Sequence, residues 1–206
     1  MFHRALGVVA VVAVGLGAGC SEDEPRGAVA SRFEAVKAEA PNTGAGFCEK
    51  TWPASGAGAR KYVAPPLREL PPGTKAAKAE AAGGWTWVNV WATWCEPCRD
   101  EMALLGRWKD TLAREGSPFR LELLSADAPD GGVALKTAIG RGLPGPVTWI
   151  RSEEDFGPFL DSIGVGRDAA LPIHALVDPQ GQLRCVRVGA IHDRDYPVVK
   201  RLLSAP

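Results

Sequence analysis

The pair Cys95 and Cys98 is the part of this sequence with the clearest chemistry. Two cysteines separated by two residues lie one helical turn apart, and a thiolate at a helix start is stabilised by unpaired backbone N–H groups and by the helix dipole. Cys95 can attack a disulfide of another protein, and Cys98 can resolve the mixed disulfide by attacking Cys95. The spacing therefore predicts two-electron thiol-disulfide exchange.

Structural zinc is the alternative use of a Cys-x-x-Cys pair. A tetrahedral site needs four ligands, and neither a second Cys-x-x-Cys nor a His-x-x-x-His follows in the chain. The three histidines, His3, His174 and His192, are scattered. We therefore expect no bound metal and no cofactor.

The elements around the dithiol are expected to be a strand followed by a helix. An apolar run over residues 85–91 predicts the strand. Pro97 suits a first helical turn, where its missing N–H costs no hydrogen bond. Apolar residues then recur at helical spacing as far as Gly116, namely Met102, Leu105, Trp108 and Leu112. The dithiol should therefore lie at the junction of a strand and a rigid helix.

The rest of the chain predicts an α/β fold. Further strands are expected over 119–125, 146–150, 172–177 and 183–188, and short helices over 133–139 and 155–163. The last two strands should form an antiparallel hairpin. A final helix, capped by Asp193 or Asp195, should bury Tyr196, Val199, Leu202 and Leu203. This β-α-β-α order favours a parallel central sheet.

The N-terminus indicates export. An uncharged apolar run over 5–18 follows a short basic start and is shorter than the roughly 20 residues of a membrane span. Residues 16–20 resemble the lipobox of bacterial lipoproteins, with Gly17 where leucine is usual. We expect a lipoprotein signal peptide over 1–19 and a diacylated Cys20. Soluble periplasmic release after ordinary cleavage is the alternative.

Composition divides the mature chain into a tether and one domain. Residues 20–46 are polar, charged and rich in Ala, Pro and Gly, which is typical of a linker, or of an ordinary frayed terminus. Residues 47–206 fit a single domain. The formal net charge is zero, so the sequence lacks the basic footprint of a nucleic-acid binder, and we expect no nucleic-acid partner.

Three segments resemble the thioredoxin superfamily, and within it the membrane-tethered TlpA/ResA-like thiol-disulfide oxidoreductases. They are the Trp-Cys-Glu-Pro-Cys motif over 94–98, Leu171-Pro172 at a strand start, and the turn over 178–181. The resemblance implies a thioredoxin-like fold: a central mixed β-sheet flanked by helices, with an N-terminal extension. It also implies a location in a Gram-negative-type periplasm and a membrane-embedded electron donor. The clients it implies are disulfide-containing proteins, such as apocytochromes c or copper-delivery proteins.

The resemblance also assigns roles. Cys95 matches the nucleophile, Cys98 the resolving thiol, and Pro172 the cis-proline that faces the dithiol and lets the strand edge bind a peptide. Leu171 departs from the small or β-branched residue usual before that proline, and an ordinary trans proline is the alternative. Glu101 matches an acidic residue that ResA-like members use near the dithiol as acid or base; a solvated helix carboxylate is the alternative.

Neighbouring residues are expected to support this site. The buried aspartate of cytoplasmic thioredoxins falls on Asn89, which does not titrate. Glu96 should be exposed and influence Cys95 by charge alone, and Trp94 should pack over the dithiol and shape the docking surface. His174 should be a satisfied core or edge histidine rather than a partner of the dithiol.

Cys48 and Cys185 remain once Cys20 is assigned to lipid and two cysteines to redox chemistry. In an oxidising compartment such a pair predicts a structural disulfide. Closing so long a loop stabilises a fold by up to about 5 kcal/mol in the chain-entropy description. Two buried free thiols, or a second functional thiol, are the alternatives.

The predicted function is reduction of client disulfides at the periplasmic face of a membrane. A disulfide oxidase or isomerase on the same fold is the near alternative, because small shifts in thiol chemistry decide the direction of electron flow. A copper(I)-binding module is the alternative from another class, since thiolates favour that soft ion.

Overall fold

The computed structural model describes residues 46–74 and 84–204 of the 206-residue chain. The expected signal peptide, Cys20 and nearly all of the expected tether lie outside these residues. The strands are β1 (Lys50–Thr51), β2 (Arg60–Lys61), β3 (Leu67–Arg68), β4 (Trp85–Trp91), β5 (Phe119–Ser125), β6 (Val147–Ile150), β7 (Ile173–Val177) and β8 (Gln182–Val188). The helices are α1 (Glu96–Arg114), α2 (Gly132–Gly140), α3 (Glu153–Ser162) and α4 (Tyr196–Leu203), with short 3-10 turns η1 (Pro129–Gly131) and η2 (Asp193–Asp195).

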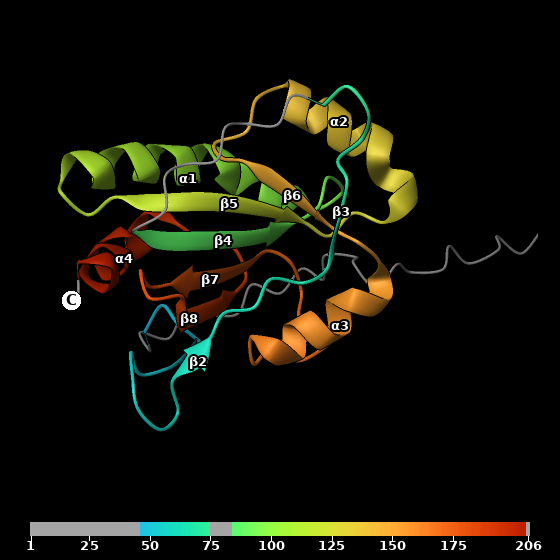
Figure 1. The fold of residues 1–206 in the computed structure, drawn as a ribbon. Coiled ribbons are helices and arrows are strands. Elements are labelled where there is room, and N and C mark those ends of the chain that lie inside the picture. Colours follow the sequence, from blue (N-terminus) through green and yellow to red (C-terminus); the bar gives the residue numbers. More distant parts are fainter. Residues whose placement is uncertain (1–45, 75–83, 205–206) are drawn as a thin grey trace, which may run out of the picture.

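All eight strands belong to one mixed sheet. Its order is β1-β8-β7-β4-β5-β6-β3, with β2 also paired to β8. β4 runs parallel to β5 and antiparallel to β7, and β5 runs parallel to β6. Figure 1 shows the sheet across the middle of the molecule with the helices around it. The predicted mixed sheet with flanking helices is confirmed, and β7 and β8 account for its antiparallel half.

Strand β4 lies in the interior of the domain, and all seven of its residues are buried. A strand covered on both faces is apolar along its whole length instead of alternating, and the run of Trp and Val in β4 has that composition. Its carboxyl end leads directly into the loop before Cys95. A fully buried strand therefore leads into the loop that ends at the dithiol.

Helix α1 packs its apolar face into the core through Leu105, Trp108 and Leu112. The helix ends where the sequence predicts, because Gly116 adopts a positive φ of 83° and Ser117 N donates to Leu112 O. Glycine reaches this left-handed conformation without the steric cost that other residues bear. A rigid, well-terminated helix thus holds Cys98 at its first turn.

The N-terminal part of the domain covers both edges of the sheet, which the sequence does not predict. β1 and β2 pair with β8, and β3 pairs with β6 at the opposite edge. Each of these strands is two residues long and mostly exposed, so no alternation of apolar residues marks it. Covering an edge strand blocks pairing with other chains.

The starts of α3 and α4 each differ from expectation in one respect. α3 begins two residues earlier than predicted, because Ser152 is its N-cap residue and three acidic side chains fill its first turn. Asp195 is the N-cap residue of α4, as expected, but its side chain accepts a hydrogen bond from His192 N at the start of η2 and makes no capping bond to α4. Of the four apolar side chains expected under α4, Val199 and Leu203 are buried, and Tyr196 and Leu202 are partly buried.

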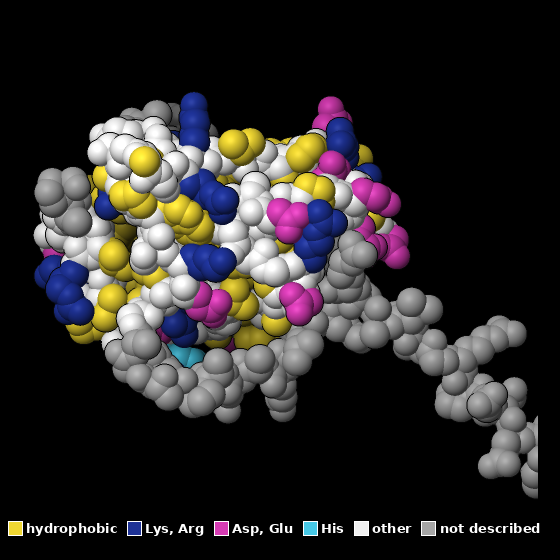
Figure 2. Space-filling view, turned by 90° about the horizontal axis from the view of Figure 1, so that it is seen from below, with side chains coloured by type: hydrophobic (Ala, Val, Ile, Leu, Met, Phe, Trp, Pro, Cys, Tyr) yellow, Lys and Arg dark blue, Asp and Glu magenta, His cyan; other side chains and the backbone are white. Residues whose placement is uncertain are grey.

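The surface shows no single dominant charge. Figure 2 shows one face on which basic, acidic and hydrophobic side chains are mixed, in line with the zero formal net charge. None of the helices in the described part of the chain has the length and apolar character needed to cross a membrane.

Candidate redox site

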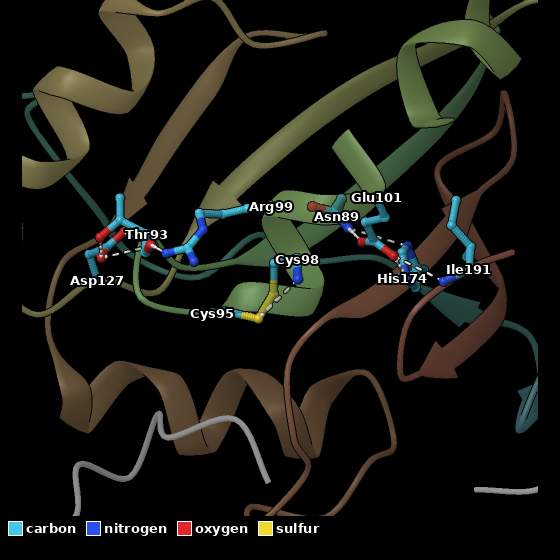
Figure 3. Close-up of a disulfide and its surroundings, with 9 residues drawn as sticks. All are labelled: Asn89, Thr93, Cys95, Cys98, Arg99, Glu101, Asp127, His174 and Ile191. Atoms are coloured by element: carbon cyan, nitrogen blue, oxygen red, sulfur yellow. Dashed lines mark hydrogen bonds and ion pairs between the residues drawn. A yellow bond between two sulfur atoms is a disulfide. The ribbon is translucent and has the colours of Figure 1, made fainter. Parts of the chain in front are cut away.

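The dithiol forms a disulfide at the start of α1. Cys95 is the N-cap residue of the helix, and its Sγ accepts a hydrogen bond from Cys98 N at 3.3 Å. Cys95 and Cys98 are bonded to each other (Figure 3). Both cysteines are fully buried in this oxidised state. Pro97 lies in the first turn of α1, where the N–H group that proline lacks would have had no partner within the helix.

The Leu171-Pro172 peptide bond is cis. β7 starts at the next residue and runs antiparallel to β4, with Ile173 opposite Val90. The proline therefore lies beside the carboxyl end of β4, where the loop toward Cys95 begins. Cis bonds are rare even before proline, so this geometry marks a specific arrangement of the chain next to the disulfide.

Glu101 is buried on α1, one turn after Cys98. Only 4% of its surface is exposed, so the alternative of a solvated helix carboxylate is wrong. Its Oε1 accepts a hydrogen bond from Asn89 Nδ2 at 2.8 Å, and its Oε2 accepts one from Ile191 N at 3.0 Å (Figure 3). Each oxygen of the Glu101 carboxylate therefore has a hydrogen-bond donor.

His174 completes this buried cluster from β7. The residue has no exposed surface, and its Nδ1 lies 3.1 Å from Trp87 Nε1 and 3.3 Å from Asn89 Nδ2. On the other side of the ring, Nε2 lies 3.5 Å from Glu101 Oε2. His174 is therefore a core histidine, as expected, but it also contacts the acidic residue next to the dithiol.

A second buried carboxylate holds the loop before Cys95. Asp127 accepts hydrogen bonds from Thr93 N at 3.1 Å, from the Thr93 hydroxyl, and from Ser125 Oγ at 2.8 Å. From the opposite side, Arg99 donates to Thr93 O at 2.7 Å. The sequence analysis did not identify these residues. The signal was present, because Asp127 follows β5 and the carboxyl ends of parallel strands meet at one edge of a sheet.

A pocket of about 410 Å³ opens beside the disulfide. Its lining residues come from the first half of α1 and the loop after β8: Pro97, Asp100, Glu101, Leu104, Arg107, Ala190, Ile191, His192 and Asp193. Glu101 thus faces the buried cluster and also the pocket. Trp94 and Glu96 are exposed next to the cysteines. In the described part of the chain, no group of three His, Cys, Asp or Glu side chains is arranged to hold a metal ion.

Comparisons with known proteins point the same way. The thiol-disulfide oxidoreductase ResA of Bacillus thuringiensis (strain Al Hakam) is 28% identical over 112 residues, which are 54% of this chain and 58% of that protein. ResA of Geobacillus thermodenitrificans (strain NG80-2) is 26% identical over 150 residues, or 72% of this chain and 78% of that protein. No family model matches the chain. The chain is therefore similar to ResA-type thiol-disulfide oxidoreductases.

The match spans under two thirds of the length of the Bacillus relative. Among solved structures, a thioredoxin-related protein from Neisseria meningitidis serogroup B overlaps with a TM-score of 0.46 and 23% identity, over 60% of this chain and 87% of that one. At that TM-score the overlap adds little. The resemblance to ResA rests on the sequence relatives and agrees with the strand order and dithiol position of the chain itself.

In this ResA-like chain, the structure brings together Cys95, Cys98, Pro172 and Glu101 at one end of β4 and β7. Cys48 and Cys185 lie elsewhere and form a second disulfide, with their Cα atoms 5.4 Å apart. The roles assigned to these six residues stay predictions.

Proposed function

We propose that this chain is a thiol-disulfide oxidoreductase that reduces disulfides of client proteins. The observation that carries the proposal is the disulfide at the start of α1, placed next to a cis-proline and a buried carboxylate. In the reduced protein, the Cys95 thiolate attacks a client disulfide, which forms a mixed disulfide and releases one client thiolate. The Cys98 thiolate then attacks Cys95 Sγ and releases the second client thiolate. Two electrons pass to the client, and the protein ends as the disulfide.

Glu101 is the proposed proton acceptor for Cys98. Residues three apart on a helix are neighbours, with Cβ atoms about 5–6 Å apart, so a proton would have only a short distance to cover between the two side chains. Because Glu101 also lines the pocket, a proton taken from Cys98 has a path to solvent and to the client thiolates. Proton transfer of this kind typically contributes about 10²–10⁴-fold to a rate.

Client binding is proposed at the surface around Trp94. The exposed ring of Trp94 offers apolar contact area, whereas Pro172 is buried and its carbonyl already accepts a hydrogen bond from Gly189 N, so Trp94 is the proposed contact for a client. Both cysteines are buried in the oxidised state, so we expect this surface to open locally when the disulfide is reduced from outside.

The proposed location is extracytoplasmic. The export signal supports it, as does a disulfide between Cys48 and Cys185, which persists in oxidising compartments. We propose that residues 1–19 are a lipoprotein signal peptide, that Cys20 is diacylated, and that residues 20–46 tether the domain to the membrane. A membrane-embedded donor then re-reduces the dithiol, and apocytochromes c or copper-delivery proteins are the proposed clients.

The midpoint potential of the Cys95–Cys98 couple in the full chain tests the direction of electron flow. A value near or below about −250 mV, in the range of thioredoxin, is the result expected for a reductant. A value above about −150 mV contradicts the proposed reductase and indicates an oxidase or isomerase instead. Thiol labelling of Cys48 and Cys185 in the same samples ensures that the titrated couple is the intended one.

A further inference from the structure

The hydrogen bonds around His174 fix which ring nitrogen carries the proton. The indole Nε1 of Trp87 is a donor only, and it lies 3.1 Å from His174 Nδ1. The amide nitrogen of Asn89, which donates to Glu101 Oε1, lies 3.3 Å from the same atom. Nδ1 is therefore an acceptor. The neutral ring must carry its proton on Nε2.

The Nε2–H group of His174 points toward Glu101. The distance from Nε2 to Glu101 Oε2 is 3.5 Å, and Nε2 makes no hydrogen bond within the described part of the chain, so Glu101 is the acceptor that it faces. Both side chains are buried, at 0% and 2% exposed. A buried donor without an acceptor is costly, so Nε2–H favours a negative charge on the carboxylate that it faces.

Topology makes His174 a link between the two elements that form the site. His174 lies two residues after Pro172 on β7 and directly opposite Asn89 on β4. Its contact with Glu101 connects this part of the sheet to α1, one turn after Cys98. The ring therefore joins the strand that carries the cis-proline to the helix that carries the dithiol.

Resting on the function proposed above, we propose that His174 is a positioning residue that holds the Glu101 carboxylate beside the dithiol and thereby makes the protein a stronger reductant. A negative charge next to Cys98 opposes thiolate formation, which destabilises the reduced protein relative to the disulfide. His174 is suited to this role because Trp87 and Asn89 hold it as a neutral donor, so it does not cancel the charge of Glu101. Glu101 thus projects from α1, and Asn89 on β4 and His174 on β7 face its carboxylate.

Two substitutions of His174 test the contacts of its two ring nitrogens separately. Asn at position 174 supplies an acceptor near Nδ1 for Trp87 and does not reach Glu101, whereas Gln extends an amide donor to the place of Nε2. We expect His174→Asn to shift the equilibrium constant with glutathione about tenfold toward the dithiol, which is about 30 mV. His174→Gln should shift it by less than about threefold.

Glu101 provides the second arm of the test. Glu101→Gln should shift the equilibrium in the same direction as His174→Asn, and the two changes together should give no more than Glu101→Gln alone, because both act through one charge. Asp110→Asn, an exposed carboxylate on the same helix, is the matched control and should stay within about twofold of the parent chain. Equal effects of Asn and Gln at position 174, or a full His174→Asn effect in the Glu101→Gln background, would overturn the proposal.

A spectroscopic measurement covers the case in which the variants do not fold. Long-range ¹H–¹⁵N NMR spectra of the unmodified full chain should show His174 as the Nε2–H tautomer, and the Nδ1–H tautomer or a charged ring at neutral pH contradicts the proposal. The failure of the proposed function is distinguishable, because it appears as absent reduction of client disulfides by the parent chain. Neither the glutathione equilibrium nor the tautomer requires a client.

Discussion

The two disulfides of this chain span nearly the same distance between Cα atoms and differ in what surrounds them. Their Cα atoms are 5.4 and 5.3 Å apart, but one closes a loop of 137 positions and the other a loop of three. A disulfide that closes a long loop restricts the unfolded chain strongly, whereas one within a helical turn restricts it little. Sequence separation alone therefore predicts that Cys48–Cys185 stabilises the fold and that Cys95–Cys98 is available for chemistry.

The surroundings of the two disulfides support the same division. Cys48–Cys185 joins the start of the domain to β8, where Phe47 packs edge-on against Trp87 and Glu49 N donates to Val186 O. These contacts are apolar or within the backbone ladder. Cys95–Cys98 instead has the buried Glu101 one helical turn away and a pocket that opens to solvent. Proton transfer is possible at the second site and has no evident partner among the described contacts at the first.

The largest expected effect comes from the two cysteines of α1. Cys95→Ser should reduce exchange with a client disulfide to the uncatalysed background, because no thiolate remains at the helix start. Cys98→Ser should instead accumulate a mixed disulfide between Cys95 and the client, because the resolving thiol is missing. Non-reducing gels and mass spectrometry measure both outcomes. Exchange that persists in Cys95→Ser, with only a lower copper(I) stoichiometry, would favour a metal-binding module over an enzyme.

The next effect concerns stability. Replacing both Cys48 and Cys185 by Ala should lower the free energy of unfolding by about 2–5 kcal/mol, because the unfolded chain gains the entropy of an open loop. The rate of exchange at Cys95 should change by less than about twofold at temperatures where the variant is folded. Denaturant unfolding under oxidising conditions measures the first quantity. A variant of unchanged stability that loses exchange would reverse the roles assigned to the two disulfides.

Much of this fold follows from local sequence signals. β4, β5 and the β7–β8 hairpin have strong apolar runs bounded by turn residues, and α1 has a continuous apolar face and a glycine at its end, so these elements match their predictions closely. β1, β2 and β3 are two-residue strands whose existence depends on partners far along the chain. No local pattern of 46–74 predicts them, because backbone pairing with β8 and β6 stabilises them.

The candidate site divides in the same way. The motif over 94–98 and the Leu171-Pro172 dipeptide are contiguous in sequence and identify the dithiol and its neighbouring strand. The surroundings of Glu101 come from separate elements, because Asn89, His174 and Ile191 belong to β4, β7 and the loop after β8. Sequence analysis left Glu101 open between a buried acid and a solvated carboxylate, since helical spacing alone does not show what covers that part of α1.

Two buried aspartates extend the comparison to the loops near each disulfide. Asp127 accepts hydrogen bonds from the loop before Cys95, and Asp178 accepts them from Gln180 N and Gln182 N in the β7–β8 turn before Cys185. Asn at either position replaces an acceptor oxygen with a donor that faces other donors, so each substitution should cost about 1–3 kcal/mol of stability. Only Asp127→Asn should also slow exchange, by about threefold or more, because only Asp127 positions the loop of the dithiol.

Equal slowing of exchange by Asp127→Asn and Asp178→Asn would show that stability, and not loop position, limits the rate. Denaturant unfolding and the rate of client reduction are measured on the same preparations. Both substitutions remove a buried carboxylate that is 4% exposed, and Asp178→Asn also weakens the ion pair with Arg184, so its cost in stability should be at least as large. Slower exchange in Asp127→Asn alone therefore reports on position and not on stability.

The smallest effect lies away from both disulfides, where Tyr196 on α4 donates a hydrogen bond to Glu115 at the end of α1. Burial, and then the hydrogen bond to Glu115, raise the pKa of Tyr196 to about 12, and burial also raises the pKa of Tyr62, the other tyrosine of the chain. The folded protein should therefore show little tyrosinate absorbance at about pH 11, whereas the unfolded chain titrates near pH 10.

Because the pKa of Tyr196 is higher in the folded than in the unfolded chain, its contribution to stability is complete below about pH 10 and is lost as the pH rises toward about 12. Glu115→Gln removes the charge that the tyrosinate would face, so it should lower the pKa of Tyr196 toward its usual range while burial keeps part of the shift. Spectrophotometric titration measures the change. The same substitution should leave both the midpoint potential of Cys95–Cys98 and the long-loop disulfide unaffected. A shift in either would mean that the α1–α4 contact is coupled to a disulfide and that the two regions are not independent.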